Sequence, residues 1–92
     1  MSRFEGLPGA DLVERGLADL DRGVASAEAL LVSIGAPRLR LSGVAISRAE
    51  PDPEHRLYHL LAQEDSDSAH GRYNALVRRL VSFERALECA SR

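Results

Sequence analysis

The last third of the chain carries the pattern that most constrains its fold. Apolar residues recur there at alternating steps of four and three: Ala69, Tyr73, Leu76, Leu80, Phe83, Leu87 and Ala90, with Val77 widening the row. Such steps place side chains on one face of an α-helix. At 1.5 Å per residue this helix would be about 35–40 Å long, as long as a domain of this size is wide. The pattern predicts a long amphipathic helix whose end projects from the domain or packs on another chain.

The preceding residues also favour helices. Leu and Ala supply most of the apolar side chains, and β-branched residues are few, a composition typical of helical proteins. Pro8 is expected at the first position of the first helix, where proline is tolerated. Gly23, followed by Ser26 as a candidate N-cap, predicts two helices, about 9–22 and 26–35. One long helix also fits, because the apolar phase continues across the glycine.

Two signals define the middle of the chain. Gly35, Ala36 and Pro37 form a glycine-then-proline helix stop, and residues 38–47 then alternate polar and aliphatic side chains around a turn pair. The alternation is compatible with a β-hairpin, but an isolated two-stranded ribbon is barely stable, and no other segment offers a partner strand. A short helix from Pro37 to Gly43 is the preferred prediction.

The predicted short helix from Pro37 to Gly43, which forms a corner of the chain, indicates where four side chains lie. Leu39 and Leu41 are expected to anchor the turn in the core, whereas Arg38 and Arg40 are expected to face solvent beside the end of the preceding helix. Replacing both arginines should then leave folding nearly unchanged.

A further helix is expected from Pro53 to about residue 64, with Asp52 as its N-cap. The sequence therefore predicts an all-α fold: four to five helices in a small orthogonal or bundle-like domain with a long C-terminal helix. Residues 1–92 are expected to form a single helical domain, in which residues 1–7 need not be ordered. A chain this short buries only about 60–65% of the surface that its unfolded form exposes, so self-association commonly supplements the core.

The histidines are weak candidates for a metal site. His55 and His59 stand four residues apart, as metal ligands on a helix do, but no His-Glu-x-x-His or Cys-x-x-Cys pattern supplies further ligands. Two surface histidines are the preferred interpretation, and no metal or other cofactor is predicted.

Charged residues on the C-terminal helix suggest two further features. Arg78 and Arg85 lie seven residues apart opposite the apolar row, beside Arg79, as in a basic face for nucleic acid. The net charge of −2 favours a solvated or salt-bridged face instead. Glu84 falls inside the apolar arc. If buried it needs a partner, such as an arginine from another segment or subunit, but a position at the edge of the arc, in contact with water, is preferred.

No catalytic constellation emerges, so the sequence leans against an enzyme. The chain lacks lysine, which excludes Schiff-base chemistry, and it has no Gly-x-Ser-x-Gly elbow; its one cysteine, Cys89, has no flanking motif. With one cysteine, and neither a signal peptide nor a spanning helix expected, a cytoplasmic location is predicted. Basic residues that are all arginine, with no threonine, are typical of a GC-rich bacterial genome.

The function expected is therefore that of a small protein-interaction or assembly module, homo-oligomeric through the C-terminal helix. Successive segments alternate in the sign of their charge, which favours complementary packing within or between chains. The alternatives are a nucleic-acid-associated accessory protein and, less favoured, a metal-binding protein. The predicted contact residues are Arg38, Arg40, Tyr73, Arg78, Arg79, Phe83, Glu84 and Arg85.

Overall fold

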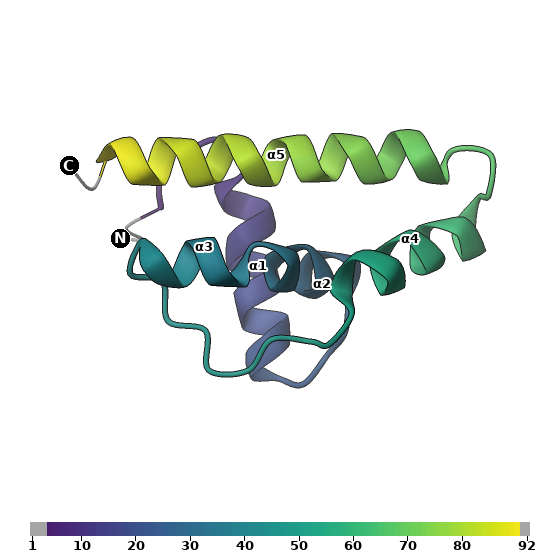
Figure 1. Ribbon diagram of the computed structural model, residues 1–92, viewed down its shortest axis with the longest axis horizontal. Helices are drawn as coiled ribbons and strands as arrows, with labels where there is room; N and C mark the ends of the chain where they lie inside the picture. The colour runs from purple at the N-terminus through teal and green to yellow at the C-terminus, as the bar shows by residue number, and fades with distance from the viewer. Residues whose placement is uncertain (1–3, 91–92) are drawn as a thin grey trace.

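The computed structural model describes residues 4–90, and all regular structure in that range is helical. The helices are α1 (Ala10–Asp21), α2 (Ala27–Ile34), α3 (Ala36–Leu41), α4 (Pro53–Glu64) and α5 (Ala69–Ala90). Helix α5 runs along one long edge of the molecule, α3, α2 and α4 lie in a layer beneath it, and α1 crosses behind them (Figure 1). The prediction of an all-α fold with four to five helices and a long C-terminal helix is confirmed.

The break between α1 and α2 is built by side chains as well as by Gly23. The Ser26 hydroxyl accepts a hydrogen bond from the Ala29 N–H at 3.1 Å and donates one to Asp19 Oδ2 at 2.6 Å. Asp19 also accepts from Arg22, and the Ser26 and Arg22 interactions hold the pKa of the buried Asp19 carboxyl below its ordinary value. The chain turns at Gly23, whose φ is +72°. The prediction of two helices is confirmed.

The predicted start of the first helix is wrong, whereas the predicted start of α4 is confirmed. Pro8 precedes α1, which begins at Ala10 after Gly9 adopts a left-handed backbone conformation with φ of +78°. Asp52 does occupy the N-cap position of α4, but its φ is +49° and its side chain makes no capping hydrogen bond. In both cases a left-handed residue sets the direction in which the chain enters the helix.

Helix α1 crosses α2 at Gly16, where the two backbones come very close. A Cβ atom added to Gly16 would lie 2.4 Å from the carbonyl oxygen of Glu28 and 2.5 Å from Val32 Cγ2. These distances are shorter than any van der Waals contact, so no residue larger than glycine fits unless the helices move apart.

The core lies between α5 and the layer of shorter helices. Its largest fully buried side chains are Phe83, Leu31, Leu39, Leu57, Leu61, Val13 and Val32. Phe4, 7% exposed, packs edge-on against Phe83 with ring centroids 5.2 Å apart. The sequence leaves open whether residues 1–7 are ordered. Phe4 belongs to the core. Residues 1–3 lie outside the part of the chain that the structure describes.

The corner forms the short helix α3, so a helix is confirmed in place of the hairpin, although it spans Ala36–Leu41 rather than Pro37 to Gly43. Its side chains follow the prediction only in part: Leu39 is 1% exposed, but Leu41 is 89% exposed. The expectation that Leu41 anchors the corner is therefore wrong. In a helix, residues two apart point in clearly different directions, so one turn of α3 cannot send both leucines into the same core.

Candidate functional site

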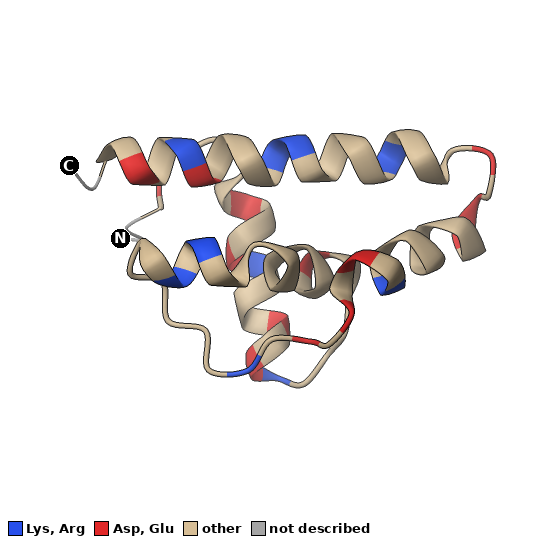
Figure 2. Cartoon of the chain, viewed as in Figure 1, with Lys and Arg blue, Asp and Glu red and all other residues tan. Residues whose placement is uncertain are grey.

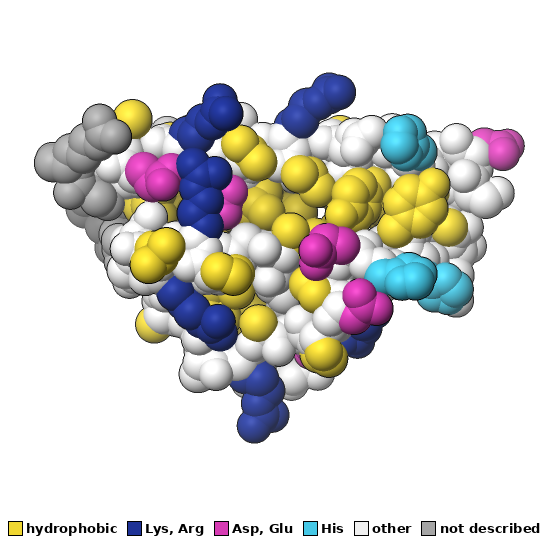
Figure 3. Space-filling view, viewed as in Figure 1, with side chains coloured by type: hydrophobic (Ala, Val, Ile, Leu, Met, Phe, Trp, Pro, Cys, Tyr) yellow, Lys and Arg dark blue, Asp and Glu magenta, His cyan; other side chains and the backbone are white. Residues whose placement is uncertain are grey.

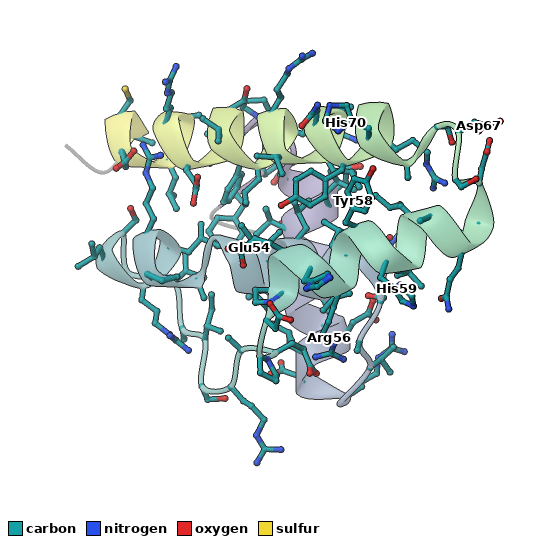
Figure 4. The ribbon with its side chains drawn as sticks, turned by 45° about the vertical axis from the view of Figure 1, so that its right-hand side comes forward. Glu54, Arg56, Tyr58, His59, Asp67 and His70 are labelled. Atoms are coloured by element: carbon teal, nitrogen blue, oxygen red, sulfur yellow. The ribbon has the colours of Figure 1, made fainter. Side chains whose placement is uncertain are left out.

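A partly exposed aromatic pair lies where α4 and α5 meet. Tyr58 of α4 is 39% exposed, and its ring centroid lies 5.8 Å from that of Tyr73 of α5, with the ring planes tilted by 58°. The Tyr58 side chain reaches from α4 toward α5 (Figure 4). Tyr73, Val77 and Val81 follow one another at steps of four on α5, and none of the three is fully buried. We call these four residues the tyrosine band.

The tyrosine band forms part of a larger apolar surface. Hydrophobic side chains gather between α5 and the helices beneath it on the face shown in Figure 3. Tyr73 and Val77 also pack against the buried core, so the band continues the interior outward to the surface. Tyr58 is not among the predicted contact residues, because its ring becomes notable only when folding places it beside Tyr73.

The two helices that border the tyrosine band carry opposite charge. Residues 50–67, which include α4, contain six acidic residues and one arginine, whereas α5 contains four arginines and two glutamates. Figure 2 shows acidic residues in α4 and the loops beside it, and basic residues at several places along α5. The pKa of the Tyr73 hydroxyl is raised, first by burial and second by the nearby negative charge of Glu54. The band is thus an apolar strip between an acidic and a basic border.

The predicted contact residues of α5 divide between surface and interior. Phe83 is 0% and Glu84 5% exposed, so both face the inside of this chain. Arg78, Arg79 and Arg85 are exposed. Arg79 lies 3.2 Å from Asp11, while neither Arg78 nor Arg85 pairs with an acid within residues 4–90.

Arg38 and Glu84 differ most from their expected positions. The prediction that Glu84 contacts water at the edge of the apolar arc is wrong, because the residue is 5% exposed. The arginine that a buried Glu84 requires is Arg38 of α3, whose Nη1 lies 3.5 Å from Glu84 Oε1. Arg38 also donates to Glu88, with Nε 3.3 Å from Oε2. Arg38 is therefore half-buried rather than solvated, and its substitution is now expected to lower stability. Arg40 is exposed and donates to the Ile46 carbonyl at 2.9 Å.

The lack of a side chain at Gly35 leaves space for the carboxylate of Glu84. Its φ is −86°, which any residue can adopt, but an added Cβ would lie 2.8 Å from Glu84 Oε2 and 3.1 Å from Leu80 Cδ1. The glycine that the sequence predicts as a helix stop is thus also required by close packing of α5 against the start of α3.

Glu84→Gln is expected to remove part of the pH dependence of stability. Burial is the main cause that raises the pKa of Glu84; the positive charge of Arg38 opposes it, and the negative charge of Glu88 adds to it. A carboxyl whose pKa is raised by folding contributes stability that is fully present below its unfolded pKa and is lost as the pH rises through its folded pKa. The neutral amide in the variant has no such loss, so the variant should gain stability relative to the wild type as the pH rises.

Chemical denaturation between pH 4 and pH 7 measures this difference. The exposed Glu64→Gln variant controls for the loss of one carboxylate. A difference between Glu84→Gln and the wild type that stays constant with pH would show that folding leaves the pKa of Glu84 unchanged, and one that favours the wild type more at pH 7 would show that folding lowers it.

The histidine candidates lie on α4 close to Tyr58, at a pocket that they share with Ala25 and Leu30. His55 and His59 line an open pocket of about 440 Å³ whose wall includes Leu30, Leu60 and Asp52. His55 Nδ1 lies 3.6 Å from Asp52 Oδ2. Within residues 4–90, no group of three or more His, Cys, Asp or Glu side chains is arranged to hold a metal ion.

Comparison with known proteins adds no assignment. Among the described residues, no helix is both long and apolar enough to cross a membrane. No protein-family model matches the chain, and neither a curated protein nor a solved structure is detectably similar to it. The function must therefore be inferred from the surfaces of the chain itself.

Proposed function

We propose that this chain is a small protein-interaction module whose partner is a second copy of itself, bound across the tyrosine band. The observation that carries the proposal is the contact of the exposed Tyr58 with the half-buried Tyr73 at the junction of α4 and α5. Tyrosine side chains are enriched at protein interfaces because their rings bury a large apolar area while the hydroxyl stays polar. A second copy would cover these rings and add to a core that is thin in a domain of this size.

Charge supports a copy of the chain as the partner. In a two-fold symmetric dimer, any contact made by α4 of one copy with α5 of the other is made twice, because the two halves of the interface are identical. An arrangement with α4 facing the partner's α5 places the acidic border of each copy against the basic border of the other. Such complementarity favours this arrangement over one that pairs α5 with α5.

The proposal includes a cytoplasmic location in a bacterium. The single cysteine, Cys89, is exposed, and an exposed thiol persists without forming intermolecular disulfides only in a reducing compartment. The all-arginine basic composition supports a bacterial source with a GC-rich genome.

Tyr58→Ser is expected to weaken self-association without unfolding the chain. Its ring is partly exposed in one copy and would be buried in the dimer, so the substitution removes interface area more than core area. Sedimentation equilibrium should give the wild type twice the 10.0 kDa mass of one chain at high micromolar concentration. The dimer dissociation constant should rise at least about tenfold in the variant, a change of about 1.4 kcal/mol.

Leu41→Ser is the matched control, because Leu41 is also an exposed apolar residue but lies on α3, outside the tyrosine band. It should dimerise as the wild type does. Equal weakening by both substitutions, or a wild type that remains monomeric, would contradict the proposal.

A further inference from the structure

Helix α4 carries a second feature close to Tyr58. We propose that His55 and His59 bind a divalent transition-metal ion of the Zn²⁺ type, with the Asp52 carboxylate adding negative charge beside the His55 ring. The site lies on the surface at the rim of the open pocket, and the ion would exchange with solvent rather than hold the fold together.

The two imidazoles are placed to act together. Residues four apart on a helix project from the same face, and both histidines line the same pocket. Two histidine side chains lie side by side over α4 in Figure 3. The pocket of about 440 Å³ leaves space for the water molecules that would complete the coordination of an ion held by two protein ligands. Imidazole nitrogen is a preferred donor for zinc, copper and nickel.

Asp52 supplies the second observation. It is the one non-glycine residue between 4 and 90 with a positive φ, +49°, a conformation that costs free energy and recurs at functional sites. Its carboxylate does not cap α4, although it occupies the N-cap position; instead Oδ2 lies 3.6 Å from His55 Nδ1. This distance is longer than a hydrogen bond, so the role of the carboxylate is to place a negative charge near a cation held by the imidazole.

The charge around the imidazoles is compatible with a cation. Arg56, which lies between the two histidines in the sequence, donates from Nη1 to Glu50 Oε2 at 3.0 Å and to the Pro51 carbonyl at 3.2 Å. Its positive charge is thereby balanced by Glu50. Because no third His, Cys, Asp or Glu donor joins the pair within the described part of the chain, weak binding in the micromolar range is expected.

Titration calorimetry with ZnCl₂ alone on the untagged full chain tests the site. The wild type should bind one ion per chain. His55→Gln and His59→Gln should each weaken binding at least about tenfold, and Asp52→Ala should weaken it by a smaller factor, because it removes a nearby negative charge but no ligand. His70→Gln should bind as the wild type does, since His70 lies on α5 and contacts Asn74 at 3.2 Å. All these side chains are exposed, so the helical circular-dichroism spectrum should be unchanged.

Cys89→Ser separates this site from binding by the exposed thiol, and it should retain wild-type affinity. The inference would be overturned by a wild type without saturable binding, by histidine variants that bind zinc as the wild type does, or by loss of binding in Cys89→Ser alone.

Discussion

Gly16→Ala is expected to lower the free energy of unfolding by about 3 kcal/mol, a large fraction of the stability of a domain this small. The added methyl group would lie 2.4 Å from the carbonyl oxygen of Glu28, which belongs to the backbone of α2. A flexible side chain could turn aside, but a helix backbone cannot. Helices α1 and α2 would have to separate, and Val13 and Val32, which are buried near this crossing, would lose contacts.

Gly71→Ala is the matched control for this substitution. Gly71 also lies inside a helix, but nothing would come within 4 Å of an added Cβ. Alanine there should increase stability by about 0.5–1 kcal/mol, because it loses less backbone entropy in a helix than glycine does. Urea unfolding of both variants measures the two effects. If Gly16→Ala were as stable as Gly71→Ala, the close crossing of α1 and α2 would be wrong.

Phe83→Ala is expected to lower the free energy of unfolding by about 3–5 kcal/mol, as the loss of a buried aromatic side chain usually does. Phe83 is 0% exposed, and its ring packs edge-on against Phe4 at 5.2 Å. The sequence predicts Phe83 as a contact with another chain, whereas the structure places it in the core of its own chain. The cost of Phe83→Ala should therefore arise mainly within one chain.

Urea unfolding at two protein concentrations distinguishes the two roles of Phe83. A core residue should give nearly the same loss at both concentrations, while Leu41→Ala, at a position 89% exposed, should change stability little. A small loss of stability in Phe83→Ala combined with loss of the dimer would place Phe83 at the interface after all.

Signals within a few residues predicted the helices well. The Ser26 cap, the break at Gly23 and the stop at Gly35 act on their immediate neighbours, and the structure has a helix end or start at each. The apolar row of α5 also predicted its buried face, because a helical repeat maintained from residue 69 to 87 specifies one side of the helix.

Features that depend on distant segments could not be predicted in this way. Glu84 is buried because Arg38, 46 residues earlier in the sequence, reaches it, and because Gly35 leaves space for its carboxylate. Gly16 resembles any glycine within a helix until α2 lies against it. Tyr58 becomes notable only when folding places it beside Tyr73.

The contact surface proposed from the structure differs from the one expected from the sequence. The sequence suggests that the apolar row of α5 extends beyond its own domain, but Ala69 and Leu87, near its two ends, are 0% and 2% exposed. Most of the row is thus covered by the chain itself, but Tyr73 and Leu76 are half-buried and Ala90 is exposed. The proposed self-association uses the part where Tyr73 and Val77 meet Tyr58.

Intermolecular nuclear Overhauser effects in a mixture of ¹³C-labelled and unlabelled protein test the proposed interface most directly. If two copies bind across the tyrosine band, the ring protons of Tyr58 and Tyr73 should show such effects to side chains on α4 and α5 of the other copy. The absence of intermolecular effects from both rings, or effects confined to α1 or α3, would contradict self-association through this face.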